Sequence, residues 1–197
     1  MFGNDLDGDC YDTVGSCCTN ISGGCTPSMK HPEYYGGDIP FIKSGDVKYD
    51  VLTKGTLSLT QKALDETNAK IVPKGSVLVV VRSAALTHKF MIAVSGRNLV
   101  VNQDIKALEP NQRVLAGYLM QAIKIREQLL LDRAQTMLTT HINIKDLLDV
   151  KIPVPKIEKQ QRFADFVAQV NKSKLSIQQS IETLQTLKAK LMQEYFG

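Results

Sequence analysis

The chain has no tryptophan, and its only four cysteines all lie within the first 25 of its 197 residues. It also lacks any apolar run that approaches the roughly 20 residues a membrane-spanning helix needs. The first residues are acidic, whereas a secretory signal is basic and then apolar. These absences argue against a membrane or secreted protein. We expect a soluble, cytoplasmic protein with one main core.

The cysteine spacing does not favour a metal site. A structural zinc site usually takes its ligands from paired CxxC-like clips, but Cys10, Cys17, Cys18 and Cys25 follow the pattern C-x6-CC-x6-C. Because neighbouring side chains on a strand point to opposite faces, Cys17 and Cys18 cannot easily share one metal ion. We expect reduced thiols and no metal or other cofactor, with a zinc site or a disulfide as the alternatives.

Charge is distributed unevenly along the chain. Residues 1–50 carry three Lys against eight Asp or Glu, whereas residues 51–155 carry 14 basic against eight acidic residues. Residues 156–197 carry seven basic and four acidic residues. A polyanionic partner would therefore contact the middle and the end of the chain, although such an imbalance is also common in proteins that bind no nucleic acid.

Strand and turn patterns extend to about residue 110. Turn residues occur at 23–28 and 35–38, and apolar runs predict strands at 39–43, 76–82, 90–94 and 99–101. The valine-rich runs are too continuous for a sheet with one wet face, so they should form covered central strands. A short helix is expected over residues 57–67.

Helical periodicity follows the strands. One helix with a single apolar stripe is predicted over residues 111–134, from the spacing of Leu115, Tyr118, Leu119, Ala122, Ile125 and Leu129. A helical turn at 144–149 and a strand at 150–152 come next. Pro153 and Pro155 then close the globular part, since proline cannot donate a backbone hydrogen bond. We predict a mixed α/β (α+β) domain over residues 1–155, with a mixed or antiparallel sheet and packed helices.

Residues 156–197 contain no proline, and their only glycine is the last residue. Apolar side chains recur at steps of three and four, which predicts a coiled-coil-forming helix about 60 Å long. A helix of this length extends beyond a domain of 155 residues, so most of its apolar seam needs a partner helix. The expected seam consists of Phe163, Phe166, Val167, Val170, Ile177, Ile181, Leu184, Leu191 and Tyr195.

Five segments in this order resemble the specificity subunits of type I restriction–modification systems. Residues 23–28 (GGCTPS) are similar to the family's GG-T-P-S turn, and residues 34–47 (YYGGDIPFIKSGDV) to its YY-x-G-D-I-P-W-I segment, with Phe41 at the aromatic position. Residues 73–78 (PKGSVL) resemble the P-x-G-x-V-L strand entry, and Asn102-Gln103 the N-Q pair. Residues 152–160 (IPVPKIEKQ) resemble the I-P-x-P-P-L-x-E-Q helix entry. The loops at 84–89 and 137–142 depart from the family pattern, and such loops vary with the DNA sequence that is read.

The resemblance implies one target recognition domain, at 1–155, and one conserved-region helix, at 156–197, where family members usually have two of each. The chain would be either a natural half-sized subunit or half of a longer one. It would read half of a bipartite site in double-stranded DNA. It would pair with a copy of itself or with another half, and would bring a modification methyltransferase, and in some systems a restriction subunit, to the DNA. It would have no catalytic activity of its own.

Family resemblance also implies that bases are read in the major groove while basic side chains contact phosphates. The candidates are polar or basic residues in turns next to strands: Lys43, Ser44, Arg82, His88, Lys89, Arg97, Asn98, Thr139, Thr140 and His141. For each one, a solvated surface side chain is the alternative. We expect Asn102 and Gln103 to cap a turn rather than touch bases, and Tyr34 and Tyr35 to form a hydrophobic wall rather than stack on a base.

Two other interpretations stay open. The chain could be a scaffold or interaction module whose helix recruits a protein and whose basic face is incidental. It could also be a nuclease that holds Mg2+ through Asp38, Asp46 and Lys48, although such a trio often occurs by chance. The Gly-rich loop and the N-P-P-Y-like turn of a DNA methyltransferase are both absent from the sequence.

Overall fold

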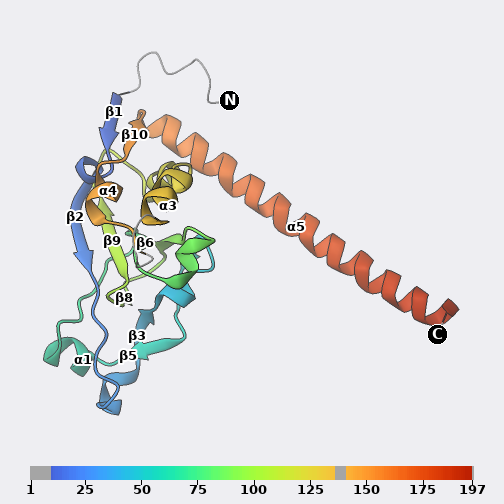
Figure 1. Cartoon of the computed structure of the whole chain (residues 1–197), viewed down its shortest axis with the longest axis horizontal. Coiled ribbons are helices and arrows are strands. Elements are labelled where there is room, and N and C mark those ends of the chain that lie inside the picture. The colour runs from blue at the N-terminus through green and yellow to red at the C-terminus, as the bar shows by residue number, and fades with distance from the viewer. Residues whose placement is uncertain (1–9, 136–140, 197) are drawn as a thin grey trace. The chain divides into compact units, whose positions relative to one another are not determined.

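The structure is a computed structural model that describes residues 10–135 and 141–196. The chain divides into two compact units, Met1–Ile157 and Glu158–Gly197. The first unit holds β1 to β10 and α1 to α4, and the second consists of helix α5, which spans Ile157–Phe196 (Figure 1). Within the described residues, no helix is both long and apolar enough to cross a membrane. The expected mixed α/β fold with a long C-terminal helix is confirmed.

A five-stranded sheet forms the centre of the first unit. Its order is β2 (Cys18–Gly23), β9 (Ile105–Pro110), β6 (Val77–Val80), β7 (Ile92–Ser95) and β4 (Val51–Leu52). Only β4 runs parallel to its neighbour; the other pairs in this sheet are antiparallel. The four side chains of the middle strand β6 are fully buried, and α2 packs on this sheet. The continuous valine run therefore forms a covered central strand, as predicted.

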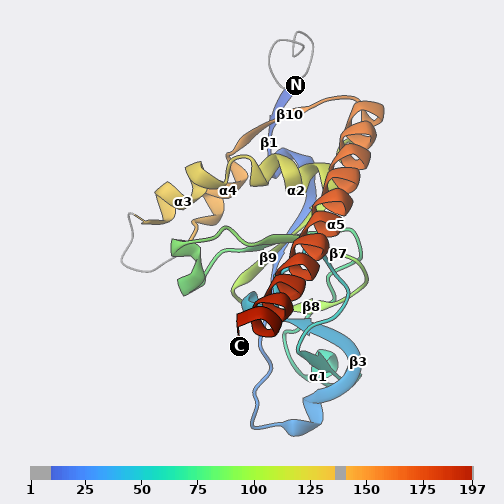
Figure 2. The ribbon, with the colours of Figure 1, turned by 90° about the vertical axis from the view of Figure 1, so that its right-hand side faces the viewer.

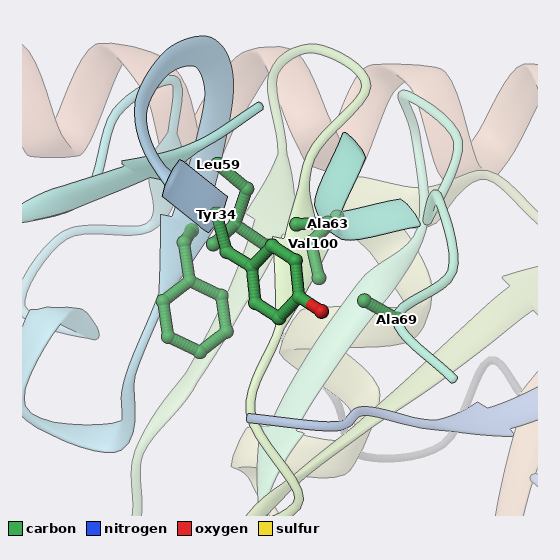
Figure 3. Close-up of a cluster of buried hydrophobic side chains, with 6 residues drawn as sticks. Tyr34, Leu59, Ala63, Ala69 and Val100 are labelled. Atoms are coloured by element: carbon green, nitrogen blue, oxygen red, sulfur yellow. The ribbon is translucent and has the colours of Figure 1, made fainter. Parts of the chain in front are cut away.

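A three-stranded sheet comprises β5 (Leu57–Leu59), β3 (Tyr35–Ile42) and β8 (Val100–Val101). Here β3 pairs antiparallel with β5 and parallel with β8. Figure 3 shows the Tyr34 ring among Leu59, Ala63, Ala69 and Val100, and the buried Phe41 belongs to the same cluster. The predicted wall is thus confirmed for Tyr34, which is buried, and Tyr35 packs against the cluster.

Three further helices belong to this unit. They are α2 (Ala116–Lys124), α3 (Glu127–Gln135) and α4 (Ile144–Leu148). Figures 1 and 2 both place α3 and α4 at the end of the unit opposite α1 and β3. A two-stranded antiparallel sheet of β1 (Cys10–Thr13) and β10 (Lys151–Val154) joins the first described residues to the last strand. The predicted turn at 144–149 and the strand near 150–152 both exist.

The expectation of one helix over residues 57–67 is half wrong. Residues Leu57–Leu59 form β5, and only Gln61–Glu66 form a helix, α1. The strand forms because its backbone pairs with β3, while Leu59 enters the core. This pairing joins residues distant in sequence and outweighs local helical preference. The expected turn at 35–38 also lies in a strand, since β3 begins at Tyr35 and carries an irregularity between Tyr35 and Ile39.

The expected single helix over residues 111–134 is two helices. The chain breaks near Ile125, where the Arg126 amide donates to the carbonyl of Ile123, three residues back. Tyr118, Leu119 and Ala122 are buried as predicted, but Ile125 and Leu129 are exposed. In α3 the buried side chains are those of Leu130 and Ala134.

Two glycines of the family-like segments have clear physical roles. Gly75, before β6, has a φ of +88°, a conformation that other residues adopt at a cost. Gly24 lies against the end of β8, where a Cβ atom would come 1.9 Å from the carbonyl oxygen of Val101. The amide of the next residue, Cys25, donates to that same oxygen at 3.2 Å. Gly24 thus allows the chain after β2 to approach β8 closely.

Replacing Gly24 by alanine should therefore lower the free energy of unfolding by about 2–3 kcal/mol, because backbone atoms must move apart. Urea denaturation measures this change. Gly117→Ala is the matched control: Gly117 lies in α2 with open space around it, so it should be neutral or stabilising by up to about 1 kcal/mol. Equal stability of Gly24→Ala and the parent would contradict the close approach.

Candidate DNA interface

The ends of three strands bring several predicted site residues together. Strands β3 and β8 are parallel, with Ile42 opposite Val101, so Lys43 lies beside the turn that follows β8. The Asn102 amide in this turn donates to the Ile42 carbonyl at 3.0 Å. Strand β6 ends at the same turn, since the Val81 amide donates to the Asp104 carbonyl at 2.8 Å. We call Lys43, Arg82, Gln103, Asp104 and His141 the strand-end cluster.

His141 joins the cluster from the segment before α4. It forms an isolated antiparallel bridge with Arg82, and the Ile142 amide donates to the Val81 carbonyl at 2.7 Å. Residues 81 and 82 therefore continue the direction of β6, with the backbone of Asp104 on one side and that of residues 141 and 142 on the other. A hollow of about 360 Å3 opens at this point, lined by Val81, Arg82, Gln103, His141 and Ile142.

Hydrogen bonds order the polar side chains of the cluster. The Arg82 Nε donates to Asp104 Oδ1 at 2.7 Å, and the Asn102 Nδ2 donates to Asp104 Oδ2 at 2.9 Å. The Thr26 hydroxyl donates to Gln103 Oε1 at 2.5 Å, which ties the cluster to the turn after β2. Asn102 is buried and stabilises this turn, as predicted. Its Oδ1 is buried without a hydrogen-bond partner among the described residues.

Gln103 and Asp104 were not predicted as candidates for DNA contact. The N-Q pair indicated a structural role, and the Gln103 side-chain Oε1 does accept the Thr26 hydroxyl, but this side chain is also exposed in the cluster. The signal for Asp104 is weak, because an Asp after such a pair is ordinary turn chemistry. Its position beside Arg82 depends on the pairing of β6 with β9, which local sequence does not reveal.

Lys43 and Ser44 lie where β3 passes into a 3-10 helix, Ser44–Asp46. The Asp46 carboxylate accepts the Lys43 amide at 2.9 Å and the Thr56 hydroxyl at 3.4 Å. Asp46 therefore stabilises a turn. The nuclease interpretation had instead assigned this carboxylate to binding Mg2+. No cluster of His, Cys, Asp or Glu suited to a metal ion occurs in residues 10–135 and 141–196.

The other candidates divide between the two ends of β6 and β7. His88 and Lys89 are exposed after the 3-10 helix Ala84–Thr87, at the same end of this strand pair as Arg82. Arg97 and Asn98 are exposed between β7 and β8, at the opposite end, where Asn98 Oδ1 accepts the Lys74 amide at 3.0 Å. Thr139 and Thr140 lie outside the described residues.

Helix α5 presents its expected seam to solvent in the single chain. The exposed fractions are 57% for Phe166, 60% for Ile177, 42% for Ile181, 64% for Leu184, 44% for Leu191 and 74% for Tyr195. Phe163, Val167 and Val170 are partly buried. Leu187 and Met192 were not predicted, yet both are exposed, and Met192 lines the same apolar groove as Leu184, Leu191 and Tyr195.

The four thiols are free, and they differ in exposure. Cys17 is buried and Cys10 is exposed. Burial raises the pKa of the Cys17 thiol, and it raises the pKa of the Cys18 thiol to about 11. The thiolate is the form that binds metals and reacts. Because these two thiols stay protonated at neutral pH, they have little reactivity there.

Comparison with known proteins identifies the class. The family model for the type I restriction modification DNA specificity domain matches residues 17–188. The chain therefore belongs to this family, whose description concerns DNA specificity and not catalysis.

Named relatives agree with this assignment. The chain is 29% identical over 181 residues to the MjaIX specificity subunit of Methanocaldococcus jannaschii, covering 89% of this chain and 41% of that protein. It is 31% identical over 148 residues to the EcoR124I/EcoR124II specificity subunit of Escherichia coli, covering 74% of this chain and 37% of that protein. The chain thus spans about two fifths of the length of these curated relatives.

Solved structures show the same fold. A chain from work on complex assembly and conformational transition of the type I R-M system matches with a TM-score of 0.74 at 21% identity, covering 98% of this chain and 46% of that one. The HsdS subunit from Thermoanaerobacter tengcongensis matches with a TM-score of 0.66 at 21% identity, covering 91% and 42%.

Proposed function

We propose that the chain reads half of a bipartite DNA target as a specificity subunit and presents that DNA to a modification methyltransferase and, where one exists, a restriction subunit. The family match over residues 17–188 carries the proposal. In this scheme the first unit contacts DNA, and α5 pairs two such units. The chain itself performs no chemistry.

The charges of the first unit support contact with phosphates. Lys43, Lys89 and Arg97 are exposed and make no ion pair with any residue in the described part of the chain. Basic side chains without an internal partner can release counterions from DNA when they bind phosphate, which supplies most of the sequence-independent affinity. Arg82, in contrast, is already paired, and this suits a side chain that must be oriented.

The exposed seam of α5 supports pairing of two chains. Apolar side chains on a long helix gain free energy when a second helix covers them. If the two helices run antiparallel, two recognition units lie at opposite ends and read an inverted repeat with a fixed spacer, because the symmetry of a dimer is mirrored in its site. Another half subunit could take the place of the second copy.

Lys89→Ala tests the phosphate-contact role. Loss of one such contact should weaken binding to every duplex by a similar factor and lower the slope of log K against log salt by about 1. Fluorescence titrations of labelled duplexes at several salt concentrations measure both quantities. Lys62→Ala is the control, because Lys62 lies in α1 and pairs with Glu33 and Glu66. Equal weak binding of the parent chain to all duplexes would instead favour a scaffold module.

Ile181→Lys tests the pairing role of α5. Ile181 is exposed in the single chain, so the lysine should not disturb its folding, whereas in a paired seam it buries an uncompensated charge. We expect the dimer dissociation constant to rise about 100-fold or more, equivalent to about 3 kcal/mol. Sedimentation equilibrium measures the constant. Gln179→Lys, on another face of the helix, should leave it unchanged, and an unaltered mass for Ile181→Lys would refute the seam.

A further inference from the structure

The Arg82 side chain is held at one edge only. Its Nε donates to Asp104 Oδ1, and Asp104 Oδ2 accepts the Asn102 Nδ2, so both oxygens of this carboxylate are used. Asn102 is itself buried, which anchors the chain of contacts in the fold. The Arg82 side chain is 60% exposed and that of Asp104 is 20% exposed. Two hydrogen bonds thus connect the buried Asn102 side chain, through Asp104, to the exposed guanidinium of Arg82.

The backbone of Arg82 is held as firmly as its side chain. The amides of Val81 and Arg82 both donate to the Asp104 carbonyl, at 2.8 and 3.3 Å. On the other side, the Ile142 amide donates to the Val81 carbonyl. The root of the Arg82 side chain therefore cannot move without breaking hydrogen bonds on both sides.

The free edge of the guanidinium is the one that suits a base. Arginine has five N–H donors in a planar fork, and Nε carries one of them. The two terminal nitrogens of Arg82 make no hydrogen bond or ion pair with any residue that the structure describes. This pair of parallel donors matches the O6 and N7 acceptors that guanine presents in the major groove.

We propose that Arg82 reads a guanine in the half-site and that Asp104 is its positioning residue, backed by Asn102. The inference rests on the proposed function. It adds which base is recognised and which two residues bring about that recognition. Asp104 touches no DNA in this scheme. It acts by ordering Arg82 before binding, so that less side-chain entropy is lost when the base is contacted.

A purely stabilising role fits the pair less well. Ion pairs that water reaches contribute little to stability, because water screens them and two flexible side chains must be ordered, and the Arg82 side chain of this pair is 60% exposed. A phosphate-attracting role also fits less well, since the carboxylate offsets the charge of the guanidinium. Orientation of the free donor edge is the property that the pair does supply.

The test is a selection from a pool of randomised duplexes by the full chain. The parent should enrich one sequence with guanine at a particular position. Arg82→Lys and Asp104→Asn should each reduce the preference for that guanine on the order of 10- to 100-fold while other positions keep theirs. The salt slope should stay the same for Asp104→Asn, because no phosphate contact is lost.

A matched control is present in the same unit. Asp12 pairs with Arg113 at 2.8 Å, with exposed fractions of 24% and 55% that are close to those of Asp104 and Arg82. Asp12→Asn removes an equivalent ion pair, so it should leave the selected sequence unchanged. Thermal melting of all variants, followed by circular dichroism, checks that each one folds.

The possible outcomes are distinct. Loss of one guanine preference in Arg82→Lys and Asp104→Asn, but not in Asp12→Asn, supports the proposal. An unchanged profile in Asp104→Asn, an equal loss at all positions, or loss of preference for another base would overturn it and leave the DNA-reading function standing. If the parent itself selects no sequence, the proposed function fails, and this inference fails with it.

Discussion

The exposed apolar seam of α5 is the constraint on which the account depends. A helix of 40 residues that shows Ile177, Leu184 and Tyr195 to water gains free energy when another surface covers them. Within a single chain these side chains stay largely exposed. A second helix of the same pattern is the simplest cover, since it offers apolar side chains at the same spacing along an equal length. Under the proposed function, such pairing would set the separation of two recognition units.

In the first unit, the packed strands fix the positions of polar side chains at the strand ends. The fully buried strand β6 fixes the backbone just before Arg82. The turn after β8 places Gln103 and Asp104 beside it, where two sheets meet. Sites built at the ends of packed strands are more rigid than sites on free loops. The fold therefore provides an ordered surface of polar side chains at these strand ends.

Sequence patterns predicted those parts of the structure that depend on local periodicity. The valine run of β6 and the proline-free heptads of α5 are examples, and both elements exist. The helix break near Ile125 was missed, because its apolar residues continue the helical spacing through the break. Strand β5 was missed because Leu57–Leu59 is short, and only its pairing with β3 distinguishes it from the helix that follows.

Three members of the strand-end cluster, Lys43, Arg82 and His141, were expected from the sequence, but their arrangement with Gln103 and Asp104 was not. Arg82 and His141 were both expected, yet their bridge joins positions distant in sequence. Thr26 and Gln103 meet across a separation of 77 residues, and the contact of Arg82 with Asp104 follows from the β6–β9 register. Such juxtapositions arise from strand pairing, whereas motif spacing reports only neighbours along the chain. For that reason Arg97 and Asn98 were grouped with residues that lie at the other end of β6 and β7.

The most direct test of the central claim is a set of spin-label distances along α5, measured by double electron–electron resonance in solution. Labels at Gln161→Cys, Gln169→Cys, Gln179→Cys and Lys190→Cys, in a chain with Cys10 and Cys25 replaced by serine, report the distance between two copies. Antiparallel pairing predicts distances that change by about 3 Å per residue along the helix, twice the helical rise, and pass through a minimum. The same short distance at every position, or no distance between copies at all, would contradict antiparallel pairing of this chain with itself.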